Sequence, residues 1–268
     1  MSDHEPQFLD IGAQGGAAAR RIAYLHDPAT APEGIGLFWL AGYKSDMAST
    51  KATELAAFAC ERGFGCTRFD YSGHGLSGGR FEDGTIGAWL AEAEAVLCEA
   101  TSGPQIVIGS SMGGHIALLL LRRLIAKRPA DAARIKAMVL IAPAWDMTEE
   151  LMWKQFPDEA RRQLLETGVY LQPSEYGEPY AITRALIEEG RQHLLKREPF
   201  DPGCPVVILQ GALDEAVPVA HARELLSFLK GGSVKLIEIP DGEHRLSRPE
   251  DLALLFATVD ELAESTLP

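Results

Sequence analysis

The chain has 268 residues, a formal net charge of −13, 46% hydrophobic residues and 24% charged residues. This length fits one α/β domain with room for an insertion, and the composition is ordinary for a globular protein. The acidic balance argues against nucleic acid and against an anionic membrane surface as partners.

Taken in chain order, short apolar runs alternate with longer segments of helical periodicity. Strands are predicted at 20–26, 35–40, 65–70, 105–108, 136–141, 206–210 and 234–239. Helices are predicted at 51–62 and 85–100, after the strand at 105–108, and after each of the last two strands. This alternation is typical of an α/β fold with a mostly parallel, doubly wound sheet and helices on both faces.

The segment 105–121 gives the strongest indication of the reaction class. An apolar strand pattern leads into the G-x-S-x-G turn of residues 109–113, and an apolar helix pattern follows. Strand, turn and helix together indicate the nucleophile elbow of an α/β-hydrolase, with Ser111 as the nucleophile of an acyl transfer. The same letters occur at 75–79, but loop-like sequence on both sides argues against Ser77.

Residues 144–202 interrupt the alternation. This stretch contains helical patterns at 149–156, 158–167 and 180–197, several prolines and no strand signal. Because it follows the strand after the elbow helix, beside the expected substrate position, we expect a small helical cap over the active site. The predicted organisation is a core at 1–143, a cap insertion at 144–202 and the rest of the core at 203–268.

A serine nucleophile needs a base, and the base needs an acid that orients it; hydrolases of this type supply them in the order Ser, acid, His. Asp214 follows the strand 206–210, where a carboxylate points into the crevice at the strand ends. Asp146 is the weaker alternative, and Glu215 would face the other way in an extended chain. His244, between the last strand and the last helix, is the predicted base.

The predicted oxyanion hole needs two backbone N–H donors. One is expected from Met112, directly after the nucleophile, and the other from Tyr43, where Gly42 permits a tight turn after the strand 35–40. Two further histidines are expected near the site without occupying the base position: His74 on a glycine-rich loop and His115 at the start of the elbow helix.

Cofactors and a membrane-inserted segment are not expected. The four cysteines form no C-x-x-C pair, which favours free thiols in a reducing compartment over a metal site. The longest apolar run, residues 116–125, is broken by Arg122 and Arg123, and the first residues lack the pattern of a signal peptide. The sequence therefore predicts no metal, no organic cofactor, no stable membrane insertion and a cytoplasmic location.

Segments spread over most of the chain resemble the α/β-hydrolase domain-containing protein 10 family and its bacterial relatives. They are residues 40–47, 69–75, 103–114 and 241–245 in the core, and 149–153 and 173–177 in the expected cap. The resemblance implies an acyl-protein (palmitoyl) thioesterase that also acts as an esterase on acyl glucuronides. It also implies Ser111, Asp214 and His244 as nucleophile, acid and base. His115 departs from the family pattern, which has Trp there, and this leaves substrate scope open.

The predicted function is a serine hydrolase that cleaves an acyl ester or thioester, of a small molecule or an acylated protein, through an acyl-enzyme. Two alternatives share the fold: a carbon–carbon bond hydrolase and a peptidase. A non-catalytic binding protein is a third, and the presence of all three predicted catalytic residues argues against it. The sequence does not predict acyl chain length or oligomeric state.

Overall fold

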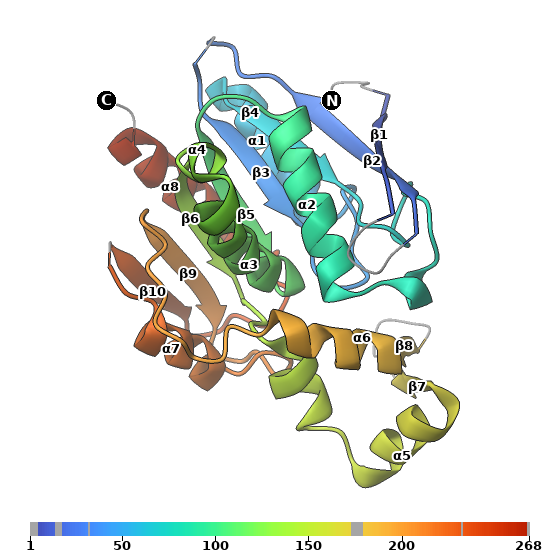
Figure 1. Ribbon diagram of the computed structural model, residues 1–268. Coiled ribbons are helices and arrows are strands. Elements are labelled where there is room, and N and C mark those ends of the chain that lie inside the picture. Colours follow the sequence, from blue (N-terminus) through green and yellow to red (C-terminus); the bar gives the residue numbers. More distant parts are fainter. Residues whose placement is uncertain (1–4, 14–17, 32, 173–178, 232, 267–268) are drawn as a thin grey trace.

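A computed structural model describes residues 5–13, 18–31, 33–172, 179–231 and 233–266 (Figure 1). Its central sheet has eight strands in the order β1-β2-β4-β3-β5-β6-β9-β10. They are β1 (Gln7–Ile11), β2 (Arg20–Asp27), β3 (Gly36–Leu40), β4 (Gly65–Phe69), β5 (Gln105–Ser110), β6 (Ile135–Ile141), β9 (Val206–Gly211) and β10 (Val234–Ile239). From β4 to β10 every neighbouring pair is parallel, whereas β2 pairs antiparallel with both β1 and β4.

Helices cover both faces of this sheet (Figure 1). The helices of the core are α1 (Thr50–Arg62), α2 (Ile86–Ala100), α3 (Met112–Lys127), α4 (Pro129–Ala132), α7 (Val219–Phe228) and α8 (Pro249–Thr266), with a short 3₁₀ turn η1 (Phe81–Asp83). Helices α2 and α3 lie on one face, and α1 and α8 lie on the other, where Phe58 stacks on Phe256. The predicted fold class is therefore confirmed.

The middle strands are buried on both faces, which explains their nearly unbroken apolar runs. Every residue of β3, β5 and β9 is buried. The register places Leu40 of β3 beside Gly109 of β5, and Ser110 beside Ile141 of β6. These carboxyl-terminal strand ends therefore lie side by side, and the loops that follow them share one edge of the sheet.

Most of residues 144–202, here called the inserted segment, lies beyond that edge, and its last residues run back along the core toward the start of β9 (Figure 1). The described part contains η2 (Thr148–Trp153), α5 (Asp158–Thr167), β7 (Val169–Gln172), β8 (Tyr180–Thr183), α6 (Arg184–Gly190) and η3 (Arg191–His193). The expectation of no strand here was wrong, because β7 and β8 form an antiparallel pair. Strands of four residues are too short to show a period of two clearly. The family-like residues 173–177 lie outside the described residues.

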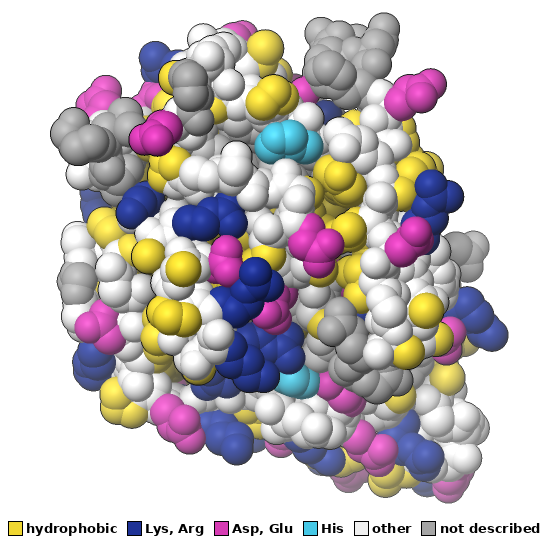
Figure 2. Space-filling model, turned by 45° about the horizontal axis from the view of Figure 1, so that its top comes forward, with side chains coloured by type: hydrophobic (Ala, Val, Ile, Leu, Met, Phe, Trp, Pro, Cys, Tyr) yellow, Lys and Arg dark blue, Asp and Glu magenta, His cyan; other side chains and the backbone are white. Residues whose placement is uncertain are grey.

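Charge is spread rather than concentrated on the face that Figure 2 draws, where acidic, basic and apolar side chains are mixed. Many of the surface ions are paired within one helical turn, as in Arg128–Asp131 and Arg162–Glu166. Exposed pairs of this kind contribute little to stability. No helix within the described ranges is long and apolar enough to cross a membrane.

Candidate active site

Ser111 lies at the sharp turn between β5 and α3. Its backbone has φ 54° and ψ −116°, a conformation that costs energy for a residue with a Cβ and that marks many functional sites. The turn is held because the Ser111 N–H donates to the Ile141 carbonyl at 2.8 Å. Glycine is required around it: a Cβ on Gly109 would lie 2.4 Å from the Gly113 oxygen, and one on Gly113 would lie 2.0 Å from the Leu40 oxygen.

The three predicted catalytic side chains lie within hydrogen-bonding distance of one another. His244 Nε2 lies 3.2 Å from Ser111 Oγ, and His244 Nδ1 lies 2.8 Å from Asp214 Oδ2. With the ring neutral, the carboxylate requires the proton on Nδ1, so Nε2 is left as the acceptor for the serine hydroxyl. The arrangement can take a proton from Ser111.

The carboxylate of Asp214 is fixed on all sides. Its side chain is fully buried, and Oδ1 accepts the N–H groups of Ala216 at 2.9 Å and Val217 at 2.8 Å. Gln210 Nε2 donates to Oδ2 at 3.1 Å. Sequence reasoning missed Gln210, although a polar residue at the end of a buried strand was a usable signal. These donors hold the carboxylate toward His244.

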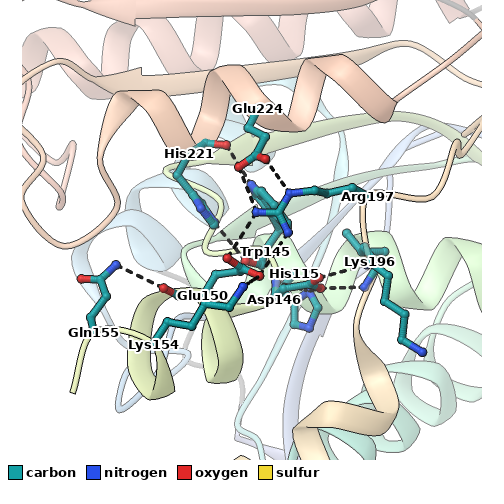
Figure 3. Close-up of polar contacts among 11 residues, drawn as sticks. His115, Trp145, Asp146, Glu150, Lys154, Gln155, Lys196, Arg197, His221 and Glu224 are labelled. Atoms are coloured by element: carbon teal, nitrogen blue, oxygen red, sulfur yellow. Dashed lines mark hydrogen bonds and ion pairs between the residues drawn. The ribbon is translucent and has the colours of Figure 1, made fainter. Parts of the chain in front are cut away.

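The alternative acid, Asp146, is bound elsewhere. It is 1% exposed, and its oxygens accept the backbone N–H groups of Leu195 at 2.6 Å and Lys196 at 3.0 Å. Figure 3 shows these contacts, which join the start of the inserted segment to its end. Glu215 is exposed on the loop beside Asp214. Of the three carboxylates considered, Asp214 alone is hydrogen-bonded to His244 among the described residues.

His115 on α3 is completely buried and points toward Asp146 (Figure 3). Its Nδ1 accepts the Asp146 N–H at 3.2 Å. Burial lowers the pKa of His115 to about 3, so the ring is neutral. Trp145, which directly precedes Asp146, stacks on His221 with the ring centres 4.3 Å apart. The Arg197 guanidinium lies 4.9 Å from the centre of the Trp145 ring. His115, Trp145, Asp146 and His221 therefore form a buried cluster beside α3.

The loop after β3 lies against Ser111. A Cβ on Gly42 would be 3.4 Å from the Ser111 Cβ. The Tyr43 N–H and the Met112 N–H, at the start of α3, have no acceptor among the described residues. Two unused donors on either side of a serine hydroxyl suit an oxyanion that forms there. Helix α3 adds the partial positive charge of its N-terminus.

A cavity of about 610 Å³ opens above Ser111 and His244. Its apolar wall comes from the core and from the inserted segment: Trp39, Ala144, Met147, Leu151, Met152, Tyr180, Ile182 and Val217. Its polar rim includes Lys44, Lys51, Glu215 and Arg245. A cavity of this size accepts a small organic group, and its apolar wall suits an acyl chain. Within the described ranges, no three His, Cys, Asp or Glu residues come together as a metal site would require.

The chain was compared with protein families, curated proteins and solved structures. Residues 15–254 match the model of the alpha/beta hydrolase family. The human palmitoyl-protein thioesterase ABHD10, a mitochondrial protein, is 33% identical over 231 residues, which are 85% of this chain and 73% of the relative.

Two solved structures cover almost the whole chain. A protein from Agrobacterium vitis S4 has a TM-score of 0.92 and 43% identity over 97% of this chain and 98% of its own. Alpha/beta hydrolase domain-containing protein 10 from mouse has a TM-score of 0.82 and 30% identity over 98% and 99%. The relatives are named as hydrolases or thioesterases, and the chain is a hydrolase. It belongs to the alpha/beta hydrolase family and, within it, to the family of α/β-hydrolase domain-containing protein 10.

Proposed function

We propose that the chain hydrolyses acyl thioesters or carboxylic esters, with Ser111 as nucleophile, His244 as base and Asp214 as the acid that orients His244. The observation that carries the proposal is the continuous contact from Asp214 Oδ2 to His244 at 2.8 Å and from His244 to Ser111 Oγ at 3.2 Å. These are the contacts that move a proton off a serine hydroxyl.

In the proposed reaction, Ser111 Oγ attacks the acyl carbonyl carbon while His244 Nε2 takes the hydroxyl proton. The carbonyl oxygen becomes an oxyanion and accepts the N–H groups of Tyr43 and Met112. The bond to the leaving sulfur or oxygen then breaks, and His244 returns the proton to it. Water repeats the sequence on the acyl-enzyme, giving the carboxylic acid and the free serine. No step requires a metal or an organic cofactor.

We further propose that residues 144–202 form a cap over the site, between core parts at 1–143 and 203–268. Leu151, Met152, Tyr180 and Ile182 of this segment line the cavity. Their apolar side chains favour an acyl chain over a polar peptide as the bound group. The palmitoyl-protein thioesterase names of the relatives support the same choice. The cytoplasmic location stays a prediction, since those relatives are mitochondrial by name.

The test is kcat/KM for acyl thioesters and matched oxygen esters of increasing chain length, with Ser111→Ala as the control. We expect turnover that rises with chain length in the wild type and is lost in Ser111→Ala, which also loses labelling by a fluorophosphonate. Preference for short aryl esters would indicate a small-molecule esterase. Activity retained in Ser111→Ala would overturn the proposal. A folded wild type that labels but turns over no ester would favour a carbon–carbon hydrolase or a peptidase, and one that does not label would favour a binding protein.

A further inference from the structure

We propose that His74 is a positioning residue that holds the oxyanion loop, residues 42–45, in its working shape. The proposal rests on the proposed function, because it concerns the Tyr43 N–H. His74 is 6% exposed and lies behind this loop rather than on the cavity wall. It acts through the loop and does not touch the substrate.

The ring of His74 bridges two loops. Its Nε2 accepts the Lys44 N–H at 3.2 Å, and its Nδ1 lies 3.1 Å from the Ser72 carbonyl oxygen. The backbone groups define both roles, because an N–H only donates and a carbonyl only accepts. One neutral tautomer satisfies them, with the proton on Nδ1 and the lone pair on Nε2. Phenylalanine has a flat ring of similar size but can make neither bond.

The hydrogen bond from the Lys44 N–H to His74 lies at a strained residue of the loop. Lys44 has φ 57°, in the left-handed region that costs energy for a residue with a side chain. The Lys44 N–H belongs to the peptide group that follows Tyr43, so holding it fixes the orientation of the Tyr43 backbone. Without an acceptor for the Lys44 N–H, the Tyr43–Lys44 peptide can rotate and the strained Lys44 conformation can relax. The preceding Gly42–Tyr43 peptide, which carries the Tyr43 N–H, is then no longer held in the direction of the oxyanion.

The acceptor is itself anchored in the core. The Ser72 carbonyl also accepts Trp89 Nε1–H at 3.2 Å. Ser72 donates its N–H and its hydroxyl to the buried carboxylate of Glu92, at 2.8 and 2.7 Å, and Arg20 pairs with that carboxylate. A continuous buried path thus runs from β2 and α2 to the oxyanion loop.

The surroundings of His74 keep the ring neutral. Its ring packs against Phe81 at 5.1 Å and Trp89 at 5.5 Å. Burial lowers the pKa of His74, against the opposing pull of the nearby carboxylates of Asp70 and Asp46. A protonated ring would present N–H groups on both sides and could not accept the Lys44 N–H.

The experiment compares His74→Phe with His74→Gln, whose amide oxygen can reach the Nε2 position, and uses His26→Phe as a matched control on β2. We expect His74→Phe to lower kcat about 10- to 100-fold with KM within about threefold, since misplacing a catalytic donor costs this order. His74→Gln restores kcat to within about fivefold of the wild type. His26→Phe changes kcat less than about twofold.

The second readout separates positioning from general damage. A trifluoromethyl ketone carrying the preferred acyl chain forms an oxyanion on the serine, whereas the matching amide does not. We expect His74→Phe to weaken the ketone by the factor lost in kcat and to leave the amide unchanged. Equal weakening of both, or no rescue by His74→Gln, would show a merely structural role and overturn the proposal.

Folding and the proposed function are controlled separately. If His74→Phe does not fold, His74→Gln and the shorter His74→Asn decide: a kcat near wild type only in Gln supports the proposal, and equal values overturn it. If Ser111→Ala abolishes activity while His74→Phe retains it, this inference alone fails. If Ser111→Ala retains activity, the proposed function fails.

Discussion

The two sides of the cavity are built differently. On the core side, backbone hydrogen bonds join neighbouring strand ends and the loops that follow them, such as Ser111 N–H to Ile141 O at 2.8 Å and Leu213 N–H to Gly242 O at 2.9 Å. On the side of the inserted segment, five residues form a separate buried cluster: Phe156, Ala160, Leu164, Ile182 and Ile187. Such a small cluster gives lower local stability than the main core. Ser111, Asp214 and His244 thus lie on the more stable side of the cavity.

The two sides meet at residues 145–146 and 195–197, here called the junction (Figure 3). Asp146 accepts the N–H groups of Leu195 and Lys196, so one carboxylate ties the start of the inserted segment to a part near its end. His115 joins this junction to α3, the helix that begins directly after Ser111. The junction therefore connects the inserted segment to the helix of the elbow.

The largest expected difference is in kcat, between variants of the two buried carboxylates Asp214 and Asp146. Asp214→Asn should lower kcat by about 10³-fold or more, because the amide no longer stabilises the charged imidazole. Its Oδ1, which alone accepts the Ala216 and Val217 N–H groups, remains in Asn, so stability should fall less than in Asp146→Asn. Asp146→Asn should lower the free energy of unfolding by about 2 kcal/mol, since its amide cannot accept both backbone N–H groups. Steady-state kinetics measures kcat of both variants, and urea unfolding measures their free energy of unfolding.

In that comparison, Asp146→Asn should keep kcat within about tenfold of the wild type, because it leaves the proton path intact. A loss of kcat as large as that of Asp214→Asn would assign Asp146 a part in the chemistry. Glu243→Gln, an exposed carboxylate beside His244, is the matched control and should change neither quantity.

The next effect is a pH dependence at the junction. The pKa of His115 falls from 6.5 in the unfolded chain to about 3 in the fold because of burial. Between these values the unfolded chain holds one more proton at this residue, so stability falls as pH decreases below 6.5. The slope from this group is about 1.4 kcal/mol per pH unit.

Urea unfolding between pH 7.5 and 4.5 checks this slope. The wild type should lose stability more steeply than His115→Gln, and the two curves should run parallel above about pH 7. His74 and His221, whose pKa values are also lowered by burial, contribute equally to both curves. Parallel curves over the whole range would show that His115 does not carry the effect.

Local patterns predicted the core well. The strands around Ser111 are buried on both faces, and such strands leave continuous apolar runs in the sequence. Asp214 and His244 were predicted because the chain order of such sites fixes which loops to search, and the structure places them within hydrogen-bonding distance. Their distances from each other depend on neighbouring parallel strands ending at one edge, which the alternation of elements implies.

The parts that sequence reasoning missed depend on contacts between distant residues. Tyr43 donates its hydroxyl to the Ala181 carbonyl at 3.2 Å, across 138 residues. His74 and Lys44 are 30 residues apart, and His115 and Asp146 are 31 apart. Such pairs leave no periodicity in either segment. The β7–β8 pair was missed because its four-residue strands are too short to show a period of two clearly.

The smallest effect tests the polar edge of the junction. Glu150 accepts hydrogen bonds from Arg197 and Lys154, and these bonds, chiefly that of Arg197, lower its pKa below 4.5. The pair is partly exposed, with Glu150 at 15% and Arg197 at 41%. Glu150→Gln should therefore cost about 1 kcal/mol or less at pH 7.

Because the fold lowers the pKa of Glu150, the stabilisation by this residue depends on pH. The stabilisation by Glu150 is complete above its unfolded value of 4.5 and is lost as pH falls through the folded value. The difference in melting temperature between wild type and Glu150→Gln should be present at pH 7 and should shrink as pH falls below 4.5. Glu159→Gln on α5 removes an exposed partner of Arg162 and should change neither measurement. A difference that does not shrink below pH 4.5 would mean that Glu150 stabilises the junction through packing and not through its charge.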